Sequence, residues 1–234
     1  MIKQIPAKIY KSETRGVFKS EKYNCFATFN FDQYQDLSRR PFGSLQILNE
    51  EILAPQHCIS RIIKANSSLI ILPLFGGIEY KDNLGNGEFL RVEQIKVIAA
   101  DDEKTVEIFN PYESENVSFL TIHFQKETQC LKKYFHKSEI DLTIRNKLIR
   151  LIEIKETSCF IGVYDGRKKG FYTLKNPDNG VFVFVVNGAF EVEDRLLESR
   201  DGLSMENAEV IEWEALSENA ILLVFEVFLK RIVE

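Results

Sequence analysis

Few side chains in this 234-residue sequence could bind a metal or act as a nucleophile. Imidazole and thiol groups serve these purposes most often, and the chain has three histidines and four cysteines. No two of His57, His123 and His136 stand two residues apart, the spacing that turns two side chains to one face of a strand. His57 and Cys58 are adjacent and would point to opposite faces of a strand. A catalytic Cys–His pair therefore stays open only between residues distant in sequence.

Other catalytic motifs are missing from the sequence. It contains no Gly-x-Ser-x-Gly, no phosphate-binding loop and no Gly-x-Gly-x-x-Gly after an expected strand. Gly85-Asn86-Gly87 falls in a polar turn, where Asn and Gly supply the positive φ angles of a tight connection. The simplest interpretation of the histidines and cysteines is therefore structural, as surface or hydrogen-bonded imidazoles and buried thiols.

The composition is that of a globular protein, at 44% hydrophobic and 12% aromatic residues. A net charge of -5 without a basic block disfavours direct binding to nucleic acid. No apolar run approaches the ~20 residues of a membrane span, so we expect no membrane partner. The cysteines are widely spaced without a Cys-x-x-Cys motif, and the first residues lack an apolar signal region. We therefore expect free thiols and a cytoplasmic location.

Short apolar runs separated by turn residues predict β-strands through residues 55–111. The runs are rich in Leu and β-branched residues, and they break at Gly76-Gly77 and in the polar segment 82–87. The second break predicts a hairpin, and the spacing of the runs is typical of a small antiparallel barrel or sandwich. Alternation over residues 117–124 predicts the closing strand, with His123 on the same face as Phe119 and Thr121.

Several segments together resemble the pirin family of the cupin superfamily. The resemblance covers nearly the whole chain, strongly to about residue 125 and more weakly beyond. It is carried by Phe42-Gly43-Ser44-Leu45-Gln46-Ile47-Leu48-Asn49-Glu50-Glu51, Ala54-Pro55, Gly76, Asp82-Asn83-Leu84-Gly85-Asn86, Asn110-Pro111 and the aromatic stretch 25–34. It implies an all-β bicupin, two tandem antiparallel β-barrels of the double-stranded β-helix or jelly-roll type with little helix.

An internal repeat supports the second barrel. Gly76-Gly77-Ile78-Glu79 recurs as Gly188-Ala189-Phe190-Glu191, each after an apolar run, and the later strands follow in the same order. We expect an N-terminal barrel over 1–125 that includes the aromatic segment, a linker over 126–141 and a C-terminal barrel over 142–234. Periodicity would allow a helix before residue 154, but the resemblance favours a strand over Leu148–Ile154.

The resemblance implies a metal site that this sequence does not reproduce. Pirins generally hold iron or another divalent metal with a His-x-His pair and a His-x-Glu pair. The corresponding positions are Ile62 and Lys64, then Val106 and Ile108. Aliphatic side chains have no lone pair to donate, and a protonated lysine repels a cation. We therefore expect no metal and no other cofactor.

A possible ligand pocket remains where the metal would lie, lined by Cys58, Ile62, Lys64, Val106 and Ile108. The Lys64 ammonium either reaches water or a carboxylate at the rim, or anchors an anion inside the barrel. Two functions follow. The first is a non-enzymatic pirin-like module that binds an unknown protein partner or a small anionic or phenolic ligand, with a regulatory role left open. The alternative is a metal-dependent dioxygenase of the quercetin 2,3-dioxygenase type, against which the replaced ligands weigh.

Overall fold

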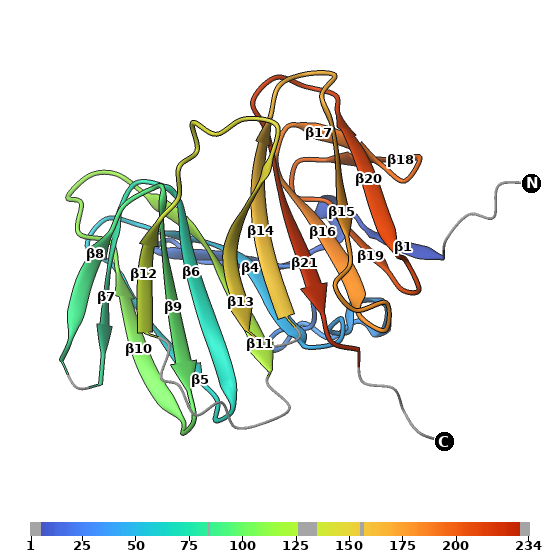
Figure 1. The fold of residues 1–234 in the computed structure, drawn as a ribbon. Helices are drawn as coiled ribbons and strands as arrows, with labels where there is room; N and C mark the ends of the chain where they lie inside the picture. Colours follow the sequence, from blue (N-terminus) through green and yellow to red (C-terminus); the bar gives the residue numbers. More distant parts are fainter. Residues whose placement is uncertain (1–5, 84, 126–134, 155–156, 230–234) are drawn as a thin grey trace, which may run out of the picture. The chain divides into compact units, whose positions relative to one another are not determined.

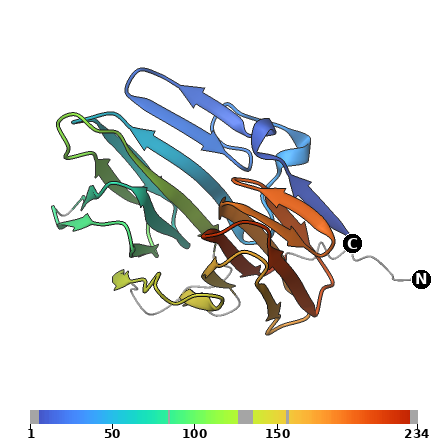
Figure 2. The ribbon, with the colours of Figure 1, turned by 90° about the horizontal axis from the view of Figure 1, so that it is seen from above.

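A computed structural model describes residues 6–83, 85–125, 135–154 and 157–229. The chain divides into two compact units, each built almost entirely of antiparallel β-sheet. We call residues 16–41 and 45–140 the N-terminal unit, and residues 1–15, 42–44 and 141–234 the C-terminal unit. The strands of each unit can be followed in Figure 1 and, from above, in Figure 2. The predicted all-β bicupin fold is confirmed.

The N-terminal unit contains a seven-stranded and a four-stranded sheet. The larger has the order β12-β9-β6-β11-β4-β3-β2, and the smaller the order β5-β10-β7-β8. A 3-10 helix, η2, spans Leu37–Arg39. The strands are β2 (Gly16–Lys19), β3 (Tyr23–Ala27), β4 (Leu45–Leu53), β5 (Cys58–Ile63), β6 (Ser67–Phe75), β7 (Ile78–Asp82), β8 (Gly87–Leu90), β9 (Gln94–Ala100), β10 (Lys104–Phe109), β11 (Val117–Gln125) and β12 (Phe135–Glu139).

The C-terminal unit contains a six-stranded and a four-stranded sheet. Their orders are β1-β19-β16-β21-β14-β13 and β15-β20-β17-β18. A 3-10 helix, η1, spans Ser12–Thr14. The strands are β1 (Ala7–Tyr10), β13 (Leu148–Ile154), β14 (Thr157–Tyr164), β15 (Lys169–Thr173), β16 (Gly180–Asn187), β17 (Ala189–Val192), β18 (Arg195–Glu198), β19 (Gly202–Met205), β20 (Val210–Ala215) and β21 (Ala220–Val227).

The predicted internal repeat is confirmed by the order of the strands. The series β9-β6-β11-β4 in one large sheet matches β19-β16-β21-β14 in the other, and β5-β10-β7-β8 matches β15-β20-β17-β18. The repeated glycines, Gly76 and Gly188, follow β6 and β16, and both have positive φ angles, of 70° and 79°. A residue with a Cβ is strained in this conformation, so glycine suits the tight turn in both copies.

Each unit has its own hydrophobic core, to which both of its sheets contribute. In the N-terminal unit, Ile71 and Phe119 of the large sheet and Ile78 and Ile108 of the small sheet belong to one buried cluster. The C-terminal unit has an equivalent cluster that includes Phe190. Where a strand contributes several residues to a cluster, they stand mainly at every second position, because successive side chains of a strand point to opposite faces.

The ends of the N-terminal barrel differ from the predicted ranges. Residues 1–15 group with the C-terminal unit, where β1 pairs with β19 and the Tyr10 ring lies 5.3 Å from that of Phe182. Part of the predicted linker, residues 135–139, is strand β12, which pairs with β9. An edge strand offers unpaired backbone groups to any nearby extended segment, and charge and hydropathy patterns do not reveal which segment will pair with it.

Two local predictions are confirmed. Residues Leu148–Ile154 form strand β13. Strands β7 and β8 form the expected hairpin, in which the Gly85 amide donates to the Asp82 carbonyl over 3.0 Å. Within the described parts of the chain, we find no helix with the length and apolar character needed to cross a membrane.

A buried carboxylate organises the loop between β15 and β16. Glu226 is 1% exposed and accepts hydrogen bonds from the amides of Lys175 and Asn176, at 3.1 and 3.0 Å. It also accepts from Asn179 Nδ2 at 2.8 Å and from the Tyr172 hydroxyl. Four donors therefore converge on one carboxylate, which satisfies the charge that burial would otherwise destabilise.

The Glu226→Gln variant should lower the free energy of unfolding by about 2–4 kcal/mol. An amide presents one oxygen and one NH2 group, so donors that now meet a carboxylate oxygen would face another donor. Urea unfolding followed by circular dichroism measures the loss. Glu206→Gln, at an exposed position of the same unit, is the control and should change stability by less than about 0.5 kcal/mol. Equal effects of the two variants would contradict the structural role of Glu226.

Candidate functional site

The five predicted pocket residues lie on two different faces of the N-terminal unit. Val106 and Ile108 are buried in its core. Ile62 is 57% exposed, and Cys58 and Lys64 are also exposed. The expectation that Ile62 and Lys64 face the same interior as Val106 and Ile108 is corrected here, and the five residues do not line one pocket.

The register of β5 against β10 explains this difference. Arg61 pairs directly with Val106 and Ile59 pairs with Ile108. Side chains at directly opposed positions lie on the same face, so the inward residues of β5 are Ile59, Arg61 and Ile63. A shift of one residue turns a whole strand to its other face. The positions that the family resemblance assigns to metal ligands on this segment therefore lie on the outward face.

Arg61 is the centre of a buried polar network in the N-terminal unit. Its side chain is 16% exposed and forms an ion pair with Glu51, which is fully buried. Arg61 Nη2 contacts Glu51 Oε2 and the Tyr23 hydroxyl, and Nε lies 3.4 Å from Glu51 Oε1. The hydroxyls of Tyr23 and Thr121 donate to the same carboxylate. Every oxygen of Glu51 is therefore occupied by a donor.

The ionisation of this network follows from burial and the ion pair. Burial opposes the charge on Arg61, but Glu51 and Tyr23 outweigh it, and the pKa of Arg61 is raised above its ordinary value. Burial, followed by the neighbouring Glu51 carboxylate, raises the pKa of Tyr23 well above its usual range. Arg61 thus stays charged at neutral pH, while Tyr23 stays protonated and can donate.

His123 lies beside the network on β11. It is 8% exposed and shares a buried face with Phe119 and Thr121, as the sequence predicted. Burial, with further contributions from the charges of Arg61 and Lys64, lowers the pKa of His123 from 6.5 to about 4. The imidazole is therefore neutral at pH 7.

One buried side chain near the network lacks a partner. Asn49 is 1% exposed, pairs across β4 and β11 with Thr121, and has neither amide atom hydrogen-bonded to any described residue. An orphaned amide in a protein interior usually marks a place where water or a ligand atom completes the hydrogen bonds. Asn49 thus extends the polar part of the interior beyond the ion pair.

Analysis of the sequence missed Glu51, Arg61 and Tyr23 as members of one site. The available signal was Arg61 itself, a charged residue between Ile59 and Ile63 at the buried phase of a strand. A charge in such a position requires a partner. Its partner lies 10 residues away in sequence on the other sheet, and only the folded chain brings the two together.

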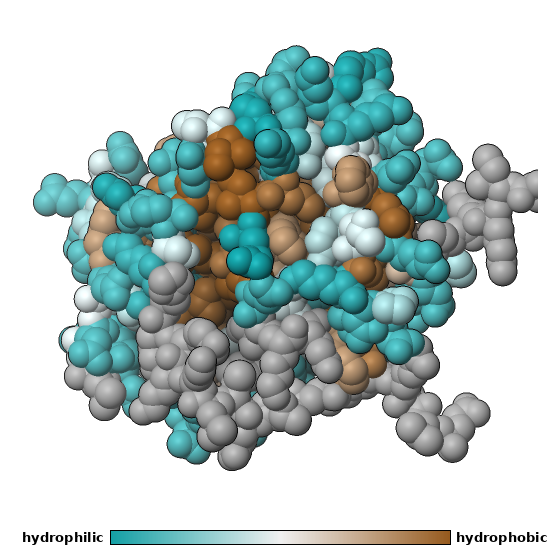
Figure 3. Space-filling view, viewed as in Figure 1, coloured by the Kyte–Doolittle hydropathy of each residue, from teal (hydrophilic) through white to brown (hydrophobic). Residues whose placement is uncertain are grey.

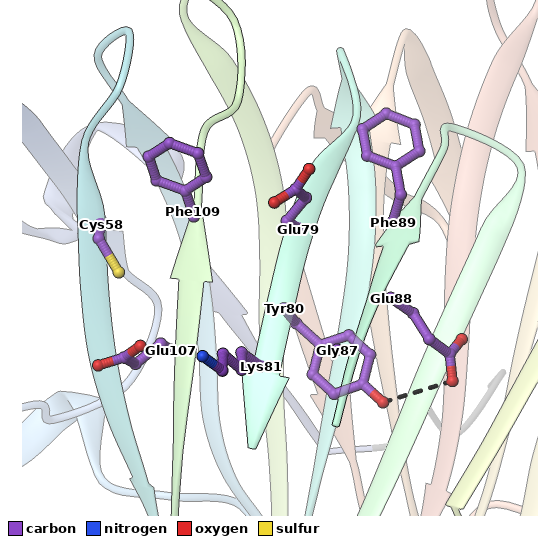
Figure 4. Close-up of a pocket in the computed structure, with 9 residues that line it drawn as sticks. All are labelled: Cys58, Glu79, Tyr80, Lys81, Gly87, Glu88, Phe89, Glu107 and Phe109. Carbon is purple, nitrogen blue, oxygen red and sulfur yellow. Dashed lines mark hydrogen bonds between the residues drawn. The ribbon is translucent and has the colours of Figure 1, made fainter. Parts of the chain in front are cut away.

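The outer face of the β5-β10-β7-β8 sheet carries a second candidate site. A groove of about 470 Å³ lies there, and Figure 4 shows its side chains. Phe109 and Phe89 stand on either side of Glu79, and Cys58 lies beyond Phe109. The groove is lined by Cys58, Glu79, Tyr80, Lys81, Gly87, Glu88, Phe89, Glu107 and Phe109.

The comparisons with known proteins agree on the fold. The family model described as the quercetinase C-terminal cupin domain matches residues 154–227. A Pasteurella multocida protein, whose name provisionally assigns it as a quercetin 2,3-dioxygenase, is 23% identical over 207 residues, 85% of this chain and 89% of its own length.

Two crystal structures of YhhW from Escherichia coli have the same fold. The first matches with a TM-score of 0.88 and 16% identity, over 97% of this chain and 99% of the other. The second, of the bacterial pirin YhhW in complex with nickel(II), matches with a TM-score of 0.87 and 16% identity, over 96% and 100%.

The two repeated antiparallel units give this protein a bicupin fold. Residues 154–227 match the quercetinase C-terminal cupin domain, and the chain as a whole shares the fold of the bacterial pirin YhhW.

The Arg61→Met variant should lower the free energy of unfolding by about 3–5 kcal/mol, because it leaves the Glu51 charge buried without its ion-pair partner. Replacing Glu51 by Gln in the same chain removes that charge, so the double variant should be more stable than Arg61→Met alone. Urea unfolding at pH 7 measures both. The exposed Lys64→Met variant serves as control and should change stability by less than about 1 kcal/mol. A loss for Arg61→Met no larger than that of the control would refute the role of the pair.

The stability of the protein should fall as the pH drops from about 6.5 to 4, in part through His123. The folded-state pKa lies below the unfolded value, so the unfolded chain binds the extra proton in this window and the folded chain does not. The contribution amounts to at most about 3 kcal/mol and is fully present above pH 6.5. Comparing wild type with His123→Gln by urea unfolding from pH 4 to 8 isolates it. His57→Gln should keep the wild-type profile, and a difference between wild type and His123→Gln that stays constant with pH would exclude the effect.

Proposed function

We propose that this protein is a pirin-like, non-enzymatic binding or protein-interaction module in which the metal site of the N-terminal barrel is degenerate. The observation that carries the proposal is the Arg61–Glu51 pair. The resemblance assigns a metal ligand to Val106, and the residue directly opposite Val106 is Arg61, a permanent cation. A guanidinium in this position repels a divalent ion at short range in a medium that screens charge poorly.

The donor chemistry around Arg61 also supports a degenerate site. Val106 and Ile108 offer no lone pair, and both oxygens of Glu51 already accept hydrogen bonds. His123 is a neutral imidazole, but it is a single ligand beside a cation. Within the described residues there is no cluster of three or more His, Cys, Asp or Glu side chains suited to a metal ion. These residues do not fit a pirin-type metal, which needs several deprotonated donors.

The alternative function is a metal-dependent dioxygenase of the quercetin 2,3-dioxygenase type. It takes its support from the name of the Pasteurella relative and from the nickel(II) complex of YhhW. Both observations concern those proteins. In this chain the reaction would need a different donor set from the positions that the family resemblance assigns.

The expected partner is a protein. A small anionic or phenolic ligand was predicted on the premise that Lys64 faces the barrel interior, and the exposed position of Lys64 removes that premise. We retain a cytoplasmic location as part of the proposal, on the basis of the widely spaced cysteines. Cys25, Cys58 and Cys159 are not in disulfide bonds, and Cys130 lies outside the described residues.

Metal analysis tests the proposal directly. The purified, tag-free protein should retain far less than about one metal ion per chain after incubation with Fe2+, Ni2+, Mn2+ or Zn2+ and desalting, because no set of donors competes with solvent. The same samples should not consume oxygen in the presence of quercetin. Retention of about one ion per chain, together with quercetin turnover that a chelator abolishes, would establish the dioxygenase alternative instead.

A further inference from the structure

The groove on the outer face of the small N-terminal sheet is built from one cross-strand row. Phe109 of β10 pairs with Cys58 on one side and with Glu79 on the other, and Glu79 pairs with Phe89. Directly opposed side chains of antiparallel strands have Cβ atoms about 4.5–5.5 Å apart. The row therefore holds a carboxylate between two aromatic rings, all on the outward face (Figure 4).

The charges in this groove are not balanced. In the next row, Lys81 lies directly opposite Glu107 in the strand register, so a positive charge stands across from that carboxylate. Glu88 is held by Lys96, whose Nζ lies 2.9 Å from Oε1. Glu79 is exposed and makes no hydrogen bond or ion pair with any other described residue. The carboxylate between the rings therefore remains available to a cation from outside.

The aromatic wall is positioned by the backbone beneath it. The ring of Phe89 lies over Gly77, where an added Cβ would come within 2.1 Å of Cζ. The Gly77 amide is in turn held by the Tyr112 hydroxyl at 3.0 Å. Phe89 remains 40% exposed, so this ring presents apolar surface to solvent.

Each edge strand of this sheet has one backbone carbonyl that already accepts a side-chain hydrogen bond. On β8, Lys137 Nζ donates to the Phe89 carbonyl at 2.9 Å. On β5, Arg61 Nη1 donates to the Ser60 carbonyl at 3.0 Å. Occupied carbonyls and charged side chains along an edge oppose the addition of another strand. These contacts favour approach of a partner over the face of the sheet, where the groove lies.

We infer that this groove receives an arginine side chain of a protein partner. A planar guanidinium can stack against the rings of Phe89 and Phe109 and donate two parallel hydrogen bonds to the Glu79 carboxylate. A lysine ammonium lacks both the plane and the fork. The inference rests on the proposed interaction role and names the chemistry of the partner.

Exposed apolar surface alone would not single out this groove. Figure 3 shows hydrophobic side chains among hydrophilic ones at the surface in that view, and much of any folded protein's surface is apolar. The corresponding sheet of the C-terminal unit also has a groove, which contains Phe171, Glu212 and Glu214. It carries more negative charge but lacks a carboxylate between two aromatic rings, and it therefore supplies a matched control.

An NMR titration of the isotope-labelled, full-length protein tests the inference. The probe is the blocked peptide acetyl-GGRGG-amide, with acetyl-GGKGG-amide as its lysine counterpart. The arginine peptide should cause saturable shifts at the amides of β7, β8 and β10 and bind about fivefold or more tighter than the lysine peptide. Glu79→Gln and Phe89→Ala should each weaken it about fivefold or more, whereas Phe171→Ala should not. Melting temperatures establish that the variants are folded.

Four results would overturn the inference: no saturable shift, equal binding of the two peptides, shifts centred on the Phe171 face, or unchanged affinity in both Glu79→Gln and Phe89→Ala. These outcomes are separate from the metal measurement. A retained metal ion would refute the proposed function while leaving the titration readable. If the protein retains no metal ion and the arginine peptide does not bind, the inference about the groove is refuted and the proposed function is not.

Discussion

The ion pair between Arg61 and Glu51 is the interaction on which the interior of the N-terminal unit depends. A charge of either sign is costly inside a barrel, and each of these two is tolerable only because the other is present. Their hydrogen bonds draw in Tyr23 and Thr121, so that both sheets are joined through one carboxylate. The positive charge of Arg61 also helps to keep His123 neutral. Burial and the charge of Arg61 thus act together to lower the pKa of His123.

The C-terminal unit also buries a carboxylate, but it stabilises this group without a cation. Glu226 is as deeply buried as Glu51, but its partners are two backbone amides, an amide side chain and a hydroxyl. The hydrogen bonds of Glu226 order a loop, whereas Glu51 forms a buried ion pair with Arg61 inside the barrel. The same repeated fold therefore carries two different polar interiors, and only the one in the N-terminal unit bears on metal binding.

These features favour a binding site on the surface of the barrel over one in its interior. In a metal-dependent cupin the chemistry requires converging donors inside the barrel. Here the groups around Glu51 satisfy one another, and Asn49 is a buried amide with no hydrogen-bond partner among the described residues. On the outer face, by contrast, Glu79 is exposed between two aromatic rings. The proposed interaction role follows from this contrast between a closed interior and an open surface.

Sequence alone determined the fold class, the internal repeat and the hairpin at residues 82–87. Each of these depends on features that can be read within single segments of the sequence: the alternation of apolar residues, the turn residues and the similarity between segments. The sequence also predicts that the side chains of Val106 and Ile108 are not metal ligands. It did not determine which residues of β5 face inward, since a strand has two phases and only pairing with β10 selects one. The same limit hid the Arg61–Glu51 pair and the row through Glu79, because both join residues on different strands. Tertiary structure decided them, since the register between strands places side chains from distant positions within contact distance.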